Sequence, residues 1–141
     1  MEIQYKITKL DEVKYWFNFD CDYENIDIDK IYFLFKPKIT PNPEHSEISV
    51  EMEVKLVNNE TPLVQQAVRA SYLVKPYEAF IESGKDKKLK IHSWELIDTF
   101  AAIAIGALRG ILAKNLYATP LKSCVLPLIS IDNLHKMLTG K

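Results

Sequence analysis

The feature that most constrains the fold is a pair of long segments in which apolar and polar residues alternate. In residues 47–56, every second side chain from Ile48 to Leu56 is apolar, and the residues between are Ser, Glu or Lys. Such alternation is typical of a strand with one buried face and one solvated face. A turn over residues 58–62 leads into a second strand-like segment, residues 63–74. Together they predict an antiparallel hairpin.

The residues before this hairpin predict further strands. Aromatic residues favour strands over 15–19 and 31–35, whereas residues 1–14 are mixed, as expected for a short strand or an arm. Two prolines in residues 40–43 predict a loop.

A long helix rich in small residues is predicted over residues 94–116, with Ser93 as its N-cap. At about 100° per residue, a wide apolar arc is formed by Leu96, Ile97, Phe100, Ile103, Ala104, Ala107, Leu108, Ile111 and Leu112. The opposite face of this helix carries mostly small residues. After a tail that contains prolines, residues 131–138 predict a short final helix. Strands followed by helices favour an α+β fold, an antiparallel sheet with helices on one face, and 141 residues suit a single domain over 1–141.

Charge is divided unevenly along the chain, although the net charge is only −1. Residues 1–60 hold 7 Lys and 13 Asp and Glu, a net −6, and the remaining residues carry a net +5. We therefore expect a two-toned surface, with no overall attraction to nucleic acid. The lysines in residues 83–90 are interpreted as a solvated loop.

Neither a secretory signal nor a membrane helix is expected. The first residues lack a basic start followed by an apolar run. The uncharged stretch 99–108 is ten residues long, about half of a membrane span. Cys21 and Cys124 are expected to be free thiols of a cytoplasmic protein.

Residues for catalysis or metal binding are not grouped in any informative pattern. The three histidines lack metal-ligand spacing, and four glycines are too dispersed for a phosphate loop. Glu51 and Glu53 share one strand face, where solvated carboxylates are common. We therefore expect no enzyme activity, no metal and no cofactor.

Apolar residues near the end of the hairpin and in the tail have two interpretations. They could close the core, or they could line a groove that binds a polypeptide partner. The groove residues would be Tyr72, Val74, Tyr77, Phe80, Leu128, Ile131 and Leu134.

The small face of the long helix predicts an oligomer interface. Gly106 and Gly110 form a Gly-x-x-x-Gly spacing, which permits close approach of a second helix or a sheet. The predicted interface consists of Ala102, Gly106, Arg109, Gly110 and Ala113.

The order of these segments resembles the SecB and SecB-like export chaperone family. The resemblance includes the strands over 48–57 and 64–74 and the helix segment Ala107-Leu-Arg109. It continues in a tail with Ala118-Thr119 and Leu126-Pro127 before the last helix. These are patterns of residue class over roughly the last two-thirds of the chain, and Ala118 stands where the family prefers Gly.

The resemblance implies a four-stranded antiparallel sheet with a long and a short helix on one face. It also implies a homo-oligomeric molecular chaperone, a dimer or a dimer of dimers (a homotetramer), that binds unfolded polypeptide in apolar grooves, as in protein export. An alternative is a dedicated adaptor, or a toxin–antitoxin-associated chaperone with one specific partner. Export chaperones use an acidic surface and a zinc-binding C-terminal extension to engage the translocase motor. These 141 residues show neither feature, so the motor is the weaker candidate partner.

Overall fold

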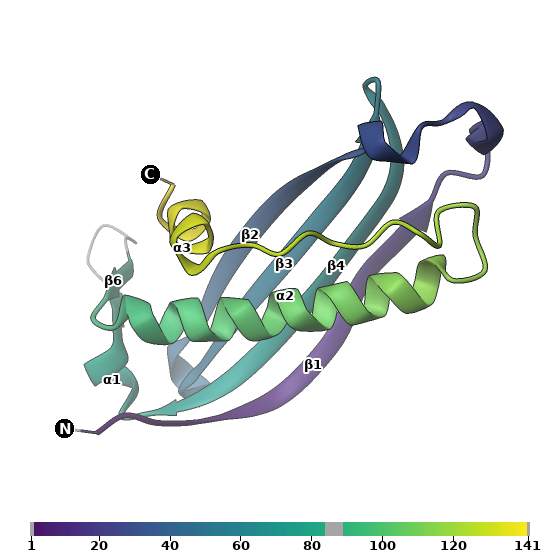
Figure 1. The fold of residues 1–141 in the computed structure, drawn as a ribbon. Helices are drawn as coiled ribbons and strands as arrows, with labels where there is room; N and C mark the ends of the chain where they lie inside the picture. The colour runs from purple at the N-terminus through teal and green to yellow at the C-terminus, as the bar shows by residue number, and fades with distance from the viewer. Residues whose placement is uncertain (1, 84–88, 141) are drawn as a thin grey trace.

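The structure is a computed structural model that describes residues 2–83 and 89–140. It contains a four-stranded antiparallel sheet with strand order β1-β4-β3-β2, and its two longer helices lie on one face (Figure 1). This confirms the predicted α+β fold. Residues 84–88 of the predicted basic loop lie outside the described part. The main elements are β1 (Gln4–Phe17), β2 (Tyr32–Asn42), β3 (Glu47–Asn58), β4 (Thr61–Lys75), α2 (Trp94–Leu116) and α3 (Ile131–Thr139).

Short elements occupy the connections. A four-residue helix, α1, and a small ribbon of β5 and β6 join β4 to α2 (Figure 1). Single 3-10 turns lie between β1 and β2 and before β3. Their bounds are α1 (Tyr77–Phe80), β5 (Ile81–Ser83), β6 (Leu89–Ile91), η1 (Tyr23–Asn25), η2 (Ile28–Lys30) and η3 (Pro43–His45).

The predicted hairpin of β3 and β4 is confirmed and forms the centre of the sheet. Its inward residues on β3, from Ile48 to Leu56, are fully buried against the helix side. Asn59 and Glu60 turn the chain with φ values of 47° and 68°. Positive φ at both central residues matches the twist of a two-residue hairpin.

The first strand is longer than the sequence predicts, because two β-bulges hide its alternation. The register shifts between Ile7 and Lys9 and again between Glu12 and Lys14. Each bulge adds one residue, so the side-chain pattern changes phase. Ile7 is opposite Tyr72 and Leu10 is opposite Ala70, which places both on the helix side of the sheet although their numbers differ in parity.

The predicted loop over residues 40–43 is wrong, because β2 continues through Pro37 and Pro41 to Asn42. β2 is an edge strand. A proline lacks the backbone N–H of a ladder hydrogen bond, but an edge strand has one side without a ladder. The two prolines are therefore compatible with the strand.

The buried face of α2 is rotated relative to the predicted arc. Ala101 and Ile105 are buried, whereas Ile103 is 41% exposed. The tail runs back beside α2 (Figure 1), and its Leu121, Cys124 and Leu126 are buried. Ser93 is the N-cap residue of α2, as predicted, but its side chain makes no capping hydrogen bond. The buried α2 side chains are Ile97, Phe100, Ala101, Ala104, Ile105, Leu108, Leu112 and Leu116.

α2 is long and apolar enough, with a mean hydropathy of 1.8, to cross a membrane by length and composition. A buried core helix has the same properties. Here its apolar side is covered by β3, β4 and the tail, which accounts for its composition.

Tyr72 gives the fold a predicted sensitivity to alkaline pH. It is buried, its hydroxyl donates to the Phe100 carbonyl oxygen at 3.0 Å, and burial raises the pKa of Tyr72 to about 12. In the unfolded chain the pKa of tyrosine is about 10. Between these values the unfolded chain binds fewer protons, so the free energy of unfolding should be constant below about pH 9 and fall as pH rises further.

Urea unfolding between about pH 8 and 11 measures this effect, with Tyr72→Phe as the comparison. The variant lacks the hydroxyl, so it should lose less stability over the alkaline range. An equal fall in both proteins would show that other groups cause the pH dependence.

Candidate functional site

A hollow of about 810 Å³ lies between α2 and α3, and we call it the α2–α3 hollow. Apolar side chains from both helices form much of its lining, and three carboxylates lie among them. The lining residues are Trp94, Glu95, Asp98, Thr99, Ala102, Ile103, Ile131, Asp132 and His135.

Helical spacing places these residues on facing surfaces. Trp94, Asp98 and Ala102 are four residues apart and therefore share one side of α2. On α3, the Ser130 hydroxyl accepts a hydrogen bond from the Asn133 amide at 3.1 Å and caps the helix. This confirms the predicted final helix. Leu134 is buried and anchors α3.

A polar contact joins the two helices at one end of the hollow. His135 Nδ1 lies 3.1 Å from both carboxylate oxygens of Asp98. The edge of the Trp94 ring packs against His135, with ring centroids 5.5 Å apart at 82°. These contacts hold α3 at a fixed place on α2.

Arg109 holds the tail in place along α2. Its Nε donates to the Leu126 carbonyl oxygen at 3.3 Å, and its Nη2 donates to the Pro127 carbonyl oxygen at 3.1 Å. Hydrogen bonds from a charged group are stronger than neutral ones. The guanidinium thus positions the segment that leads into α3.

The structure separates the predicted groove residues into two sets. Tyr72, Val74, Tyr77, Phe80 and Leu134 are at most 5% exposed, so in this chain they belong to the core and add no open surface to a groove. Of the two interpretations that the sequence allowed for these five residues, burial in the core is the one that the structure has. Leu128 and Ile131, in contrast, are 89% and 70% exposed, and Ile131 lines the hollow.

The predicted interface residues lie on the outer side of α2. Ala102, Gly106, Gly110 and Ala113 are exposed, and Arg109 is half-buried because it bonds the tail. A Cβ atom added at Gly106 or Gly110 would meet nothing within 4 Å. Ala102 also lines the α2–α3 hollow, so the predicted interface and the hollow share one edge.

Sequence reasoning missed Trp94, Ile103 and the pair of Asp98 and His135. The spacing of Trp94, Asp98 and Ala102 was a signal that these side chains share a face. The position of His135 opposite that face depends on where the tail places α3, and no sequence pattern encodes it.

The lining of the hollow combines exposed apolar side chains with carboxylates. Within residues 2–83 and 89–140, no cluster of three or more His, Cys, Asp or Glu side chains could hold a metal ion. Cys21 is half-buried and Cys124 is buried, both as free thiols, and burial raises the pKa of the Cys124 thiol. Exposed apolar side chains beside carboxylates can bind an apolar segment and select its charge.

Comparisons with known proteins show the fold. The sequence matches no family model and no curated protein. Among solved structures, the chain is similar to the SecB-like chaperone Rv1957 of Mycobacterium tuberculosis, in complex with a ChAD peptide from the antitoxin HigA1, Rv1956. The TM-score is 0.59 at 12% identity, covering 89% of this chain and 90% of that chain. A protein of unknown function from Streptococcus agalactiae gives a TM-score of 0.40 at 11% identity, covering 92% and 100% of the two chains. The chain therefore has a SecB-like fold.

Proposed function

We propose that this chain is a molecular chaperone of the SecB-like family that binds unfolded polypeptide and catalyses no reaction. The observation that carries the proposal is the likeness, over nearly the whole chain, to a SecB-like chaperone solved with a peptide. At 12% identity that likeness shows only the fold, so the function needs its own test.

The α2–α3 hollow is the proposed polypeptide site. Its volume of about 810 Å³ is within the usual range for ligand sites. Ile103 and Ile131 keep 41% and 70% of their surface exposed, which favours an apolar partner that covers them. Leu128, at 89%, extends the apolar surface onto the tail.

Suppression of client aggregation tests this function. The purified protein, mixed in equal amount with a chemically denatured client, should suppress light scattering as the client is diluted from denaturant. Ile131→Asp should abolish most of the suppression, because a carboxylate replaces an apolar contact. Tyr117→Asp is the matched control, since Tyr117 is 78% exposed and lies outside the lining of the hollow.

No suppression by the unaltered protein would exclude a general chaperone. Equal losses from Ile131→Asp and Tyr117→Asp, with both variants folded, would exclude the hollow as the site.

A dedicated partner is the second candidate. The solved SecB-like chaperone is in complex with a ChAD peptide from an antitoxin, which favours a specific client over general protein export or the translocase motor. A pull-down from the native cytoplasm that returns one stoichiometric protein would support this alternative. A pull-down that returns many unrelated unfolded chains would support the general chaperone.

Two surfaces support self-association. The first is the exposed small face of α2. The second is the sheet edge at β1, where large apolar side chains are 38–50% exposed; they are Tyr5, Ile7, Leu10, Val13, Tyr15 and Trp16. The other edge, β2, carries Pro37 and Pro41, which cannot donate to an added strand. Two different self-complementary surfaces would produce a dimer of dimers.

Substitution of Gly106 tests the α2 surface. In the single chain, Gly106→Leu has room for its side chain and improves helix propensity by roughly 0.5–1 kcal/mol, so the fold should be retained. In an interface of closely packed helices, the leucine should cost roughly 1–3 kcal/mol. The mass from light scattering should therefore fall while the thermal midpoint of the subunit is kept. An unchanged mass, equal to that of a Lys136→Leu control, would show that this face stays solvated.

A further inference from the structure

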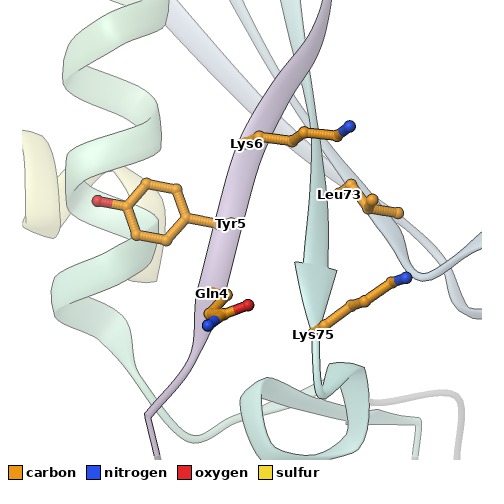
Figure 2. Close-up of a pocket in the computed structure, with 5 residues that line it drawn as sticks. All are labelled: Gln4, Tyr5, Lys6, Leu73 and Lys75. Carbon is orange, nitrogen blue, oxygen red and sulfur yellow. The ribbon is translucent and has the colours of Figure 1, made fainter.

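The face of the sheet opposite α2 and α3 has a charge that the chain as a whole does not show. Figure 2 shows the two faces at the start of β1: Tyr5 points toward α2, whereas Lys6, Leu73 and Lys75 project from the other side of the sheet. We call this other side the open sheet face. Its hollows near β1 and β2 are also lined by lysines, including Lys14, Lys36 and Lys55.

The strand register arranges the charges of the open sheet face in rows. One row runs across all four strands as Lys38, Glu51, Arg69 and Asp11, with alternating sign. The rows on either side of it each carry a net charge of +1. The register places eight cations on this face against four carboxylates, a net +4 beside the −1 of the whole chain. The two-toned surface is therefore divided by sheet face and not, as the sequence suggested, by chain half.

The cations of the open sheet face are more exposed than its carboxylates, which increases the charge imbalance. All the lysines of the face and Arg69 are exposed, whereas Asp11, Glu47, Glu51 and Glu53 are half-buried. Glu47 accepts a hydrogen bond from Thr8 at 3.4 Å, and Glu53 accepts one from Gln65. Among the described residues of this face, no lysine or arginine nitrogen lies within 4.0 Å of a carboxylate oxygen. The cations are thus free to meet a partner.

We propose that the open sheet face docks an acidic segment of a protein partner, separately from the α2–α3 hollow. Every row from Lys75 to the row of Lys55 and Gln65 holds at least one cation, over a distance of ten residues along β4. At about 3.3 Å per residue this is roughly 33 Å, the length of an extended segment of about ten residues.

A protein suits this face better than a nucleic acid. Four carboxylates, Asp11, Glu47, Glu51 and Glu53, lie in three of the six rows and would repel a uniform line of phosphates there. A polypeptide can instead place carboxylates over the lysines and leave other positions uncharged. Leu34, which lies opposite Lys55, is 51% exposed and offers apolar contact to such a segment.

Fluorescence anisotropy with a labelled ten-residue polyglutamate peptide tests this surface. The full chain should bind it, and the affinity should fall as salt rises from about 50 to about 200 mM. The double variant Lys36→Glu/Lys55→Glu should weaken binding roughly tenfold or more. Lys114→Glu/Lys122→Glu changes the net charge equally at exposed sites on α2 and the tail, so its affinity should stay within about twofold. Lys36→Gln/Lys55→Gln is the milder variant if charge reversal beside Glu53 disturbs the sheet.

Several results would overturn this proposal. The first is no binding of the peptide at low salt. The second is an equal loss of peptide affinity in the two charge-reversed double variants. The third is that a ten-nucleotide single-stranded DNA binds more tightly than the peptide and that Lys36→Glu/Lys55→Glu abolishes this binding too. Aggregation suppression by Lys36→Gln/Lys55→Gln should remain normal, because the hollow is on the other side of the sheet. Its loss would show that the two surfaces are one site.

Discussion

Replacing Phe100 with alanine should lower the free energy of unfolding by about 3–5 kcal/mol. Phe100 is fully buried where α2 crosses the sheet. Its ring stacks on Tyr72, with centroids 3.8 Å apart at 9°, and meets the edges of Tyr5 and Phe80 at 5.2 and 6.0 Å. Alanine would remove all three ring contacts and leave a cavity that the rigid strands cannot close.

Urea unfolding followed by circular dichroism measures the loss. Tyr117→Ala is the matched control, because Tyr117 is an aromatic residue at the C-cap of α2 and is 78% exposed. This substitution should change the free energy of unfolding by less than about 0.5 kcal/mol. A loss below about 1 kcal/mol for Phe100→Ala would contradict the central role of this cluster.

Replacing Gln66 with leucine should destabilise the fold by about 1–2 kcal/mol, although leucine is apolar and of similar size. Gln66 is fully buried on β4. Its Nε2 donates to Glu12 Oε2 and to the Lys14 carbonyl oxygen, both at 2.9 Å, and its Oε1 accepts from Asn115 Nδ2 at 2.7 Å. The amide thus ties the second bulge of β1 to the end of α2. Leucine would remove the donor to the Lys14 carbonyl oxygen and the acceptor for Asn115, whereas Asn115 Nδ2 would keep its bond to the exposed Glu12 carboxylate at 2.7 Å.

The neighbouring glutamine provides the control for this network. Gln65 points to the open sheet face, is half-buried and bonds Glu53. Gln65→Leu should cost less than about 1 kcal/mol, since water can reach the groups that it leaves. Equal losses from Gln65→Leu and Gln66→Leu would show that the buried network adds nothing. Hydrogen exchange should also show faster opening of β1 in Gln66→Leu.

The sequence predicted most of the framework because local patterns encode it. The alternation of Ile48, Val50 and Met52 identified β3 and its buried face, and residues 94–116 identified α2 to the residue. It failed where the pattern has local exceptions. Bulges in β1 shift the alternation, and the prolines of β2 are tolerated at a sheet edge.

For the candidate site, the sequence alone identified apolar residues without showing which of them remain exposed. It grouped Tyr72 and Phe80 with Ile131, but only Ile131 lines the hollow. Periodicity determines which face of an element is apolar, because that depends only on residues a few positions apart. The tertiary structure decided what covers each face. Ala101 and Ile105 are buried, α3 meets Trp94, and the cations on the other face of the sheet stay exposed. Those outcomes depend on contacts between distant segments, such as Arg109 with Leu126 and Asp98 with His135, which only the folded chain brings together.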